Sequence, residues 1–221
     1  MFGPVVVGTG SSTAQFFIHG GPLELLSGID IVVSAENLYL EASPFSSSSI
    51  SGRLRRAAAV KGVGGEILED VVGDSLIAWL RAHARYGMPV GEGTVAPTPS
   101  GALAERDIHR IYHAAVGTPV EGADNYVINP HAITQATHKI FEVARRERRE
   151  LDLPLSSVCL PLFGEDGGDI TLARSFEAMW GALMTELSDD SSWSIHITAR
   201  RRYSYDTLKE LLLAKKATNE A

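Results

Sequence analysis

Two segments of the chain combine small residues with the turn composition that can hold an anion. EASPFSSSSISG, residues 41–52, and FGEDGGDI, residues 163–170, each follow an apolar run typical of a strand and precede a helical pattern. Free N–H groups at a helix start carry partial positive charge, so phosphate can bind there without lysine or arginine. Ordinary strand-to-helix connections have the same composition, which on its own favours that simpler interpretation.

Other kinds of chemistry find little support in the sequence. His109 and His113 are four residues apart, but on a predicted strand this spacing does not pair metal ligands as it would on a helix. The single cysteine, Cys159, permits neither an internal disulfide nor a cysteine-based zinc site. GTGSST near the start lacks the lysine of a phosphate-binding P-loop, and no G-x-S-x-G motif is present. We therefore expect neither a metal ion nor a cofactor.

Composition narrows the class of protein further. Of the 221 residues, 44% are hydrophobic and 21% are charged, which suits a packed globular core. A net charge of −7 argues against a sequence-specific nucleic-acid partner, because binding a polyanion normally needs a basic face. No apolar run approaches the roughly 20 residues that span a bilayer, so we expect no membrane partner and a cytoplasmic location.

The elements that must position the two loops alternate along the chain. Short β-branched runs predict strands at residues 4–7, 15–18, 30–34, 93–97, 110–114, 157–160 and 194–199. Apolar residues spaced three and four apart predict helices at residues 68–80, 133–144, 172–187 and, more weakly, 205–213. This alternation predicts an α/β fold in one domain over residues 1–221, with a core of about 15–215 and a flexible tail, KKATNEA.

Five stretches, taken in order, resemble the macro domain family. IDIVVSAENLYLE resembles a strand ending in the family's VNAAN turn, and ISGRLRRAAA the helix that follows its first phosphate loop. IYHAAVG resembles the family's IHAVG strand, SSVCLPLFGEDGG its SIAFPAIGTGIGG strand and second loop, and WSIHITARRRYSYDTLKELL its closing strand and helix. The resemblance implies a three-layer α/β/α fold around a central mixed sheet, with ADP-ribose or a related nucleotide bound at the carboxyl ends of the strands.

The same resemblance assigns the candidate binding residues. Asn37 stands at the second asparagine of VNAAN, which contacts the distal ribose, although it could also simply stabilise its own turn. Glu24 lies near the position of the aspartate that binds adenine. The remaining ligand-binding candidates belong to the VNAAN-like turn and the two loops: Ala35, Ser48, Ser49, Ile50, Ser51, Gly52, Phe163, Gly164, Glu165, Asp166, Gly167 and Gly168.

Several positions depart from the family pattern. Pro22 occupies the position of the adenine-binding aspartate, so either Glu24 replaces it or the base pocket differs. Serines replace the glycine triplet of the first loop, and a surface insertion is an alternative explanation of that segment. Ser51 occupies the position that is often acidic in members that hydrolyse ADP-ribose esters, so no catalytic residue is assigned. Glu165 and Asp166 add negative charge beside the second loop, which would repel a diphosphate unless these side chains turn outward.

Three functions remain open at this stage. The first is binding of ADP-ribose or an ADP-ribose-derived nucleotide, free or attached to an ADP-ribosylated protein. The second is an ADP-ribosyl hydrolase that removes ADP-ribose from adducts by holding a water in position. The third is a fold whose crevice has become a protein-interaction surface, since function belongs to sites rather than to folds.

Overall fold

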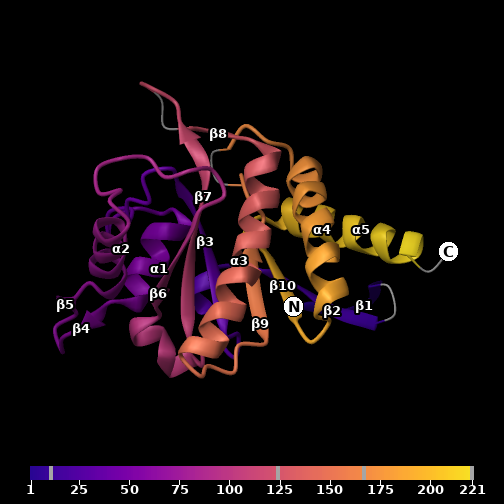
Figure 1. The fold of residues 1–221 in the computed structure, drawn as a ribbon, viewed down its shortest axis with the longest axis horizontal. Helices are drawn as coiled ribbons and strands as arrows, with labels where there is room; N and C mark the ends of the chain where they lie inside the picture. Colours follow the sequence, from indigo (N-terminus) through magenta and orange to yellow (C-terminus); the bar gives the residue numbers. More distant parts are fainter. Residues whose placement is uncertain (10–11, 123–124, 166–167, 220–221) are drawn as a thin grey trace.

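A mixed β-sheet runs through the middle of the molecule (Figure 1). The computed structural model describes residues 1–9, 12–122, 125–165 and 168–219. In this part of the chain the sheet has eight strands. In spatial order they are β1 (Phe2–Thr9), β2 (Ser12–Gly20), β10 (Ser194–Ala199), β9 (Ser157–Pro161), β3 (Ile31–Asn37), β7 (Arg110–Pro119) and β6 (Val95–Pro99), with β8 (Tyr126–Ile128) paired to the end of β7.

The five central strands are parallel. β2, β10, β9, β3 and β7 pair in the same direction, whereas β1, β6 and β8 are antiparallel to their neighbours. The carboxyl ends of the parallel strands therefore meet at one edge, which is where α/β sheets commonly bind ligands.

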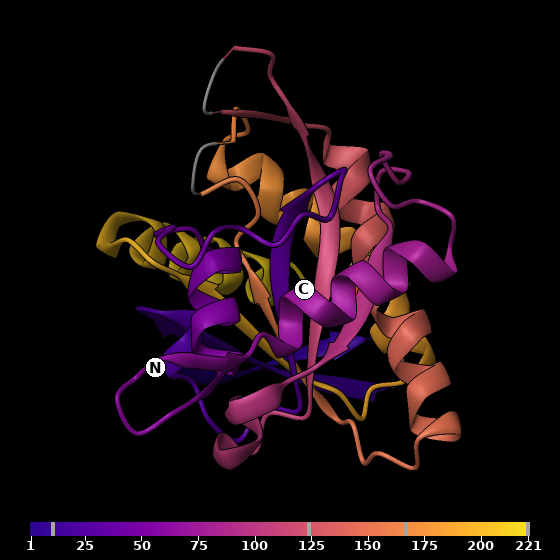
Figure 2. The ribbon, with the colours of Figure 1, turned by 90° about the vertical axis from the view of Figure 1, so that its left-hand side faces the viewer.

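Helices cover both faces of the sheet. α3 (Pro130–Glu150), α4 (Leu172–Asp189) and α5 (Arg202–Asn219) pack on one face, and α1 (Ile50–Ala58) and α2 (Val71–Ala82) lie on the other, in front of the sheet in Figure 2. Neighbouring residues of β3 alternate between the two cores: Ile31 and Val33 join the cluster of α3 to α5, and Val32 joins that of α1 and α2. The predicted three-layer α/β/α fold with a central mixed sheet is confirmed.

Most predicted elements are present, and the differences concern short or terminal pieces. All seven predicted strands form, although the one expected at 93–97 runs from Val95 to Pro99. All four predicted helices form, but the one expected from residue 68 begins at Val71, so Leu68 lies outside it. The sequence pattern missed β8 and the two-stranded sheet of β4 (Val60–Lys61) and β5 (Ile67–Glu69), as well as the 3-10 helices η1 (Leu23–Leu25) and η2 (Gly101–Arg106). Every residue of β4 and β5 is exposed, so neither shows the alternation of buried and exposed residues that marks a strand in a sequence.

The end of the chain is more regular than the sequence suggested. The expected flexible tail continues α5 as a helix to Asn219. Lys215 pairs with Glu177 of α4 at 2.6 Å, and the Asn219 amide donates to the carbonyl of Gly8 at 3.3 Å. No helix in the described residues is both long and apolar enough to cross a membrane.

Candidate functional site

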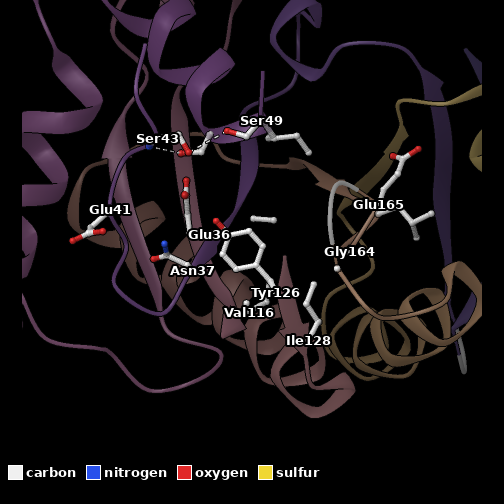
Figure 3. Close-up of a pocket in the computed structure, with 16 residues that line it drawn as sticks. Glu36, Asn37, Glu41, Ser43, Ser49, Val116, Tyr126, Ile128, Gly164 and Glu165 are labelled. Atoms are coloured by element: carbon white, nitrogen blue, oxygen red, sulfur yellow. Dashed lines mark hydrogen bonds between the residues drawn. The ribbon is translucent and has the colours of Figure 1, made fainter. Parts of the chain in front are cut away.

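A cavity opens at the carboxyl ends of β3, β7 and β9, and its empty space, including the part open to solvent, is about 660 Å³ (Figure 3). The wall is formed by the end of β3, the first turn of α1, the ends of β7 and β9, and β8. The lining residues are Ala35, Glu36, Asn37, Glu41, Ser43, Ser49, Ile50, Ser51, Val116, Gly117, Tyr126, Ile128, Leu162, Gly164, Glu165 and Gly168.

The first turn of α1 offers hydrogen-bond donors to this cavity. Ser49 caps the helix by accepting the N–H of Gly52 with its hydroxyl at 3.2 Å. No described group accepts the backbone N–H of Ile50 or Ser51, as expected for the first turn of a helix. These two N–H groups sit beside the cavity, where the helix dipole favours a negative charge.

The serine-rich loop, residues 41–49, is fixed against α1. Arg55 donates to the carbonyls of Ala42 and Ser43 at 3.1 and 2.8 Å, and Arg56 donates to the carbonyl of Ser47 at 2.6 Å. The Ser51 hydroxyl accepts the N–H of Ser43 at 3.2 Å. The loop is therefore integrated into the wall, and the serine hydroxyls largely bind one another.

The opposite wall includes Gly164, Glu165 and Gly168, which belong to the glycine loop between β9 and α4. Gly164 has φ +84°, and a Cβ there would lie 2.4 Å from Ile170, so glycine is required by both conformation and space. No described group accepts the N–H of Phe163 or Gly164. Asp166 and Gly167, both candidates from the sequence, lie outside the described residues.

The carboxylate of Glu165 lines the cavity but is engaged by hydrogen bonds from the protein. Its two carboxylate oxygens accept the N–H groups of Arg200 and Arg201 at 2.9 Å each, just before α5 begins. These N–H donors, at the N-terminal end of α5, stabilise the negative charge of the carboxylate. The part of the expected repulsion of a diphosphate that comes from Glu165 is thereby reduced.

The comparisons with known proteins agree with this geometry. No protein-family model matches the chain, and no curated protein sequence matches it. Solved structures do match: the Oceanobacillus iheyensis macrodomain with MES bound and the same macrodomain with ADP each have a TM-score of 0.70, 13% identity and coverage of 95% of both chains. A Trypanosoma brucei macrodomain in complex with ADP-ribose has a TM-score of 0.59 and 14% identity, covering 88% of this chain and 68% of that one.

The chain has the macrodomain fold. The resemblance drawn from the order of short sequence motifs is confirmed at this level. At 12–15% identity the likeness concerns the fold, so the properties of the cavity depend on its own residues.

Eight of the candidate residues line the cavity: Ala35, Asn37, Ser49, Ile50, Ser51, Gly164, Glu165 and Gly168. Four described candidates do not. Glu24 lies 3.4 Å from Arg53 on α1, Ser48 is exposed, and Phe163 is fully buried in the core. Gly52 is buried beneath the serine-rich loop, where a Cβ would come within 2.9 Å of the carbonyls of Pro44 and Ser47.

Asn37 has the turn role that the sequence offered, and it also lines the cavity. Its Oδ1 accepts the N–H of Tyr39 at 2.9 Å, so the side chain stabilises its own turn. Its Nδ2 has no described partner, and the residue lines the cavity. The side-chain NH₂ group of Asn37 is therefore available to a ligand.

Glu36 is the main residue that the sequence did not single out. It replaces the second alanine of the VNAAN motif, and its side chain is 3% exposed. Oε1 accepts the Ser34 hydroxyl at 2.7 Å and lies 2.9 Å from Nδ1 of His113, whose Nε2 lies 3.1 Å from the Thr98 hydroxyl. The sequence contained a signal for this pair, because Glu36 and His113 are ionisable residues within apolar strand patterns. Such groups are rarely buried without a partner.

Tyr126 and Ile128 of β8 also line the cavity and were missed, together with Glu41, Ser43, Val116, Gly117 and Leu162. Among the residues that the structure describes, the lining contains three carboxylates and neither lysine nor arginine. In the residues that the structure describes, no group of three or more histidine, cysteine, aspartate or glutamate side chains is placed to hold a metal ion.

Proposed function

We propose that the cavity binds ADP-ribose or an ADP-ribose-derived nucleotide. The observation that carries this proposal is the set of backbone donors without a described acceptor on opposite walls: the N–H groups of Ile50 and Ser51 at the start of α1, and the N–H of Gly164 in the glycine loop. Backbone donors suit a diphosphate in a wall without lysine or arginine. Asn37 supplies a donor for a ribose beside them.

Binding is better supported than hydrolysis. The position that is often acidic in hydrolysing members is Ser51, and its hydroxyl is already engaged by the N–H of Ser43. A serine has no negative charge at neutral pH with which to orient a water. The open cavity argues against the third alternative, a crevice converted entirely into a protein-interaction surface.

Isothermal titration calorimetry with ADP-ribose tests the proposal, and Ile50→Pro is the informative variant. Proline at the first position of a helix keeps the helix but removes the N–H donor. Ser49, with φ −63° and ψ 162°, already has the extended conformation that a residue before proline requires. A hydrogen bond to a charged group contributes about 1.5–3 kcal/mol, so Ile50→Pro should bind roughly 10- to 100-fold more weakly.

Ile50→Ala is the matched control, because it loses the same side-chain packing but keeps the N–H. It should bind ADP-ribose within about threefold of the unmodified protein, since only apolar contact is removed. Absence of any heat with millimolar ADP-ribose, or equal affinities of the proline and alanine variants, would refute the proposed arrangement.

A further inference from the structure

The cavity wall has an uneven charge that a bare nucleotide diphosphate does not explain. The charged residues of the described part of the wall are Glu36, Glu41 and Glu165. Glu165 is engaged by two backbone N–H groups, so the unbalanced negative charge lies at the strand end of the cavity, around Glu36 and Glu41. Figure 3 shows this separation, with Glu36, Glu41 and Asn37 on one side and Glu165 on the other.

Glu36 presents one committed and one available oxygen. Ser34 and His113 both bind Oε1, which fixes the orientation of the carboxylate. No described residue hydrogen-bonds Oε2, although Glu36 forms part of the cavity wall. Because the side chain is 3% exposed, a charge placed beside it would interact with much less screening than at a surface.

An aromatic ring shares this end of the cavity. Tyr126 extends from β8 toward the same space as Glu36 and Asn37 (Figure 3). Aromatic faces attract organic cations, and a neighbouring carboxylate adds direct charge attraction. A carboxylate beside an aromatic ring, in a wall without lysine or arginine, is suited to an organic cation.

We propose that this end of the cavity recognises a cationic group joined to the distal ribose, so that the preferred ligand is a cationic ADP-ribosyl conjugate. The inference rests on the proposed function, which places the diphosphate between α1 and the glycine loop and the ribose at Asn37. The anomeric carbon of that ribose then faces Glu36 and Tyr126. A pyridinium ring on this carbon, as in oxidised nicotinamide adenine dinucleotide (NAD⁺), carries a fixed positive charge of the required kind.

The test compares NAD⁺ with its reduced form, NADH, by calorimetry at pH 8. The two ligands differ little in size, but only the oxidised nicotinamide ring is cationic. The unmodified protein should bind NAD⁺ about tenfold more tightly than NADH, as expected for one poorly screened ion pair with an aromatic neighbour.

Glu36→Gln isolates the charge. The glutamine carbonyl can still accept from Ser34 and His113, so the local structure is retained. This variant should bind NAD⁺ and NADH within about twofold of each other and should keep or improve its affinity for ADP-ribose, since a carboxylate that opposes anions has gone. Glu142→Gln, on the exposed side of α3, is the matched control and should keep the full preference.

The outcomes separate this inference from the proposed function. Equal binding of NAD⁺ and NADH by the unmodified protein, or an undiminished preference in Glu36→Gln, overturns the inference while ADP-ribose binding stands. Failure of all three ligands to bind overturns both.

Discussion

Glu147, like Glu36, is a buried carboxylate that accepts hydrogen bonds from neighbouring side chains, but it lies away from the cavity. Glu147 on α3 is 5% exposed and accepts from Arg110, with Nε to Oε2 at 2.9 Å, and from the Tyr112 hydroxyl at 2.7 Å. Burial and the nearby Glu147 carboxylate raise the pKa of Tyr112 above its usual range, so its hydroxyl remains a donor. The network joins α3 to β7, the strand whose far end lines the cavity.

Removal of Glu147 should be among the most destabilising single changes in the chain. Glu147→Ala leaves the Arg110 charge, 14% exposed, without its partner, and breaking a buried pair in this way costs about 3–5 kcal/mol. Tyr112→Phe loses only one hydrogen bond and should cost about 1 kcal/mol. Urea unfolding measures both, and similar losses in the two variants would show that the ion pair is not the dominant interaction.

Residues that depend on their own segment were predictable, and residues that depend on strand register were not. The turn role of Asn37 needs only Tyr39, two positions along the chain, and the first-turn donors of α1 follow from the helix start. The network of Glu36 requires Ser34 on β3 to lie opposite His113 on β7, a pairing 79 residues apart that no local pattern specifies.

At the level of elements, the periodic patterns predicted the helices and the main strands. They did not predict how the serine-rich loop packs against α1. Gly52 decides that contact, because the loop crosses the first turn of the helix within 2.9 Å of a would-be Cβ. The resemblance to the macro domain family places Gly52 at a helix start and predicts that it contacts the ligand. Its described surroundings instead give it a role in packing the loop.

Gly52→Ala should therefore lower both stability and ligand affinity, although alanine is favoured over glycine in helices by up to about 1 kcal/mol. The backbone of Pro44 and Ser47 must move to admit the methyl group, and this shifts Ser49 and the cavity wall. We expect about tenfold weaker ADP-ribose binding by calorimetry and a melting temperature lower by several degrees.

Gly181→Ala in α4 is the control for that change. A Cβ at Gly181 meets nothing within 4 Å, so helix propensity acts alone and the melting temperature should rise slightly with unchanged affinity. A rise in stability in both variants would mean that the loop adapts to the methyl group without cost.

For the whole molecule, the two helical layers cover the sheet unequally. α1 contacts β3 and α2 contacts β6, whereas β1, β2 and β10 are contacted by α5 on the opposite face. On the α1 side of β2 and β10, Phe17 stacks on His196 with ring centroids 4.7 Å apart, and His19 Nε2 lies 2.8 Å from His196 Nδ1. Two histidines in contact on a half-buried surface make the stability of the fold sensitive to acid.

Burial, followed by the neighbouring charge of His19, lowers the pKa of His196 from 6.5 to about 4. Between these values the unfolded chain binds a proton that the folded protein does not, so this contribution to stability is complete above pH 6.5 and is lost as the pH falls toward 4.

His196→Phe keeps the stacking on Phe17 and removes the titration. After allowance for partial solvent screening, the unmodified protein should lose about 2 kcal/mol more than this variant between pH 7.5 and 4.5. The midpoints of urea unfolding at the two pH values measure this difference. His131→Gln, a change at an exposed histidine, is the control. Equal losses of stability in all three proteins would show that the His19–His196 contact does not set the acid sensitivity.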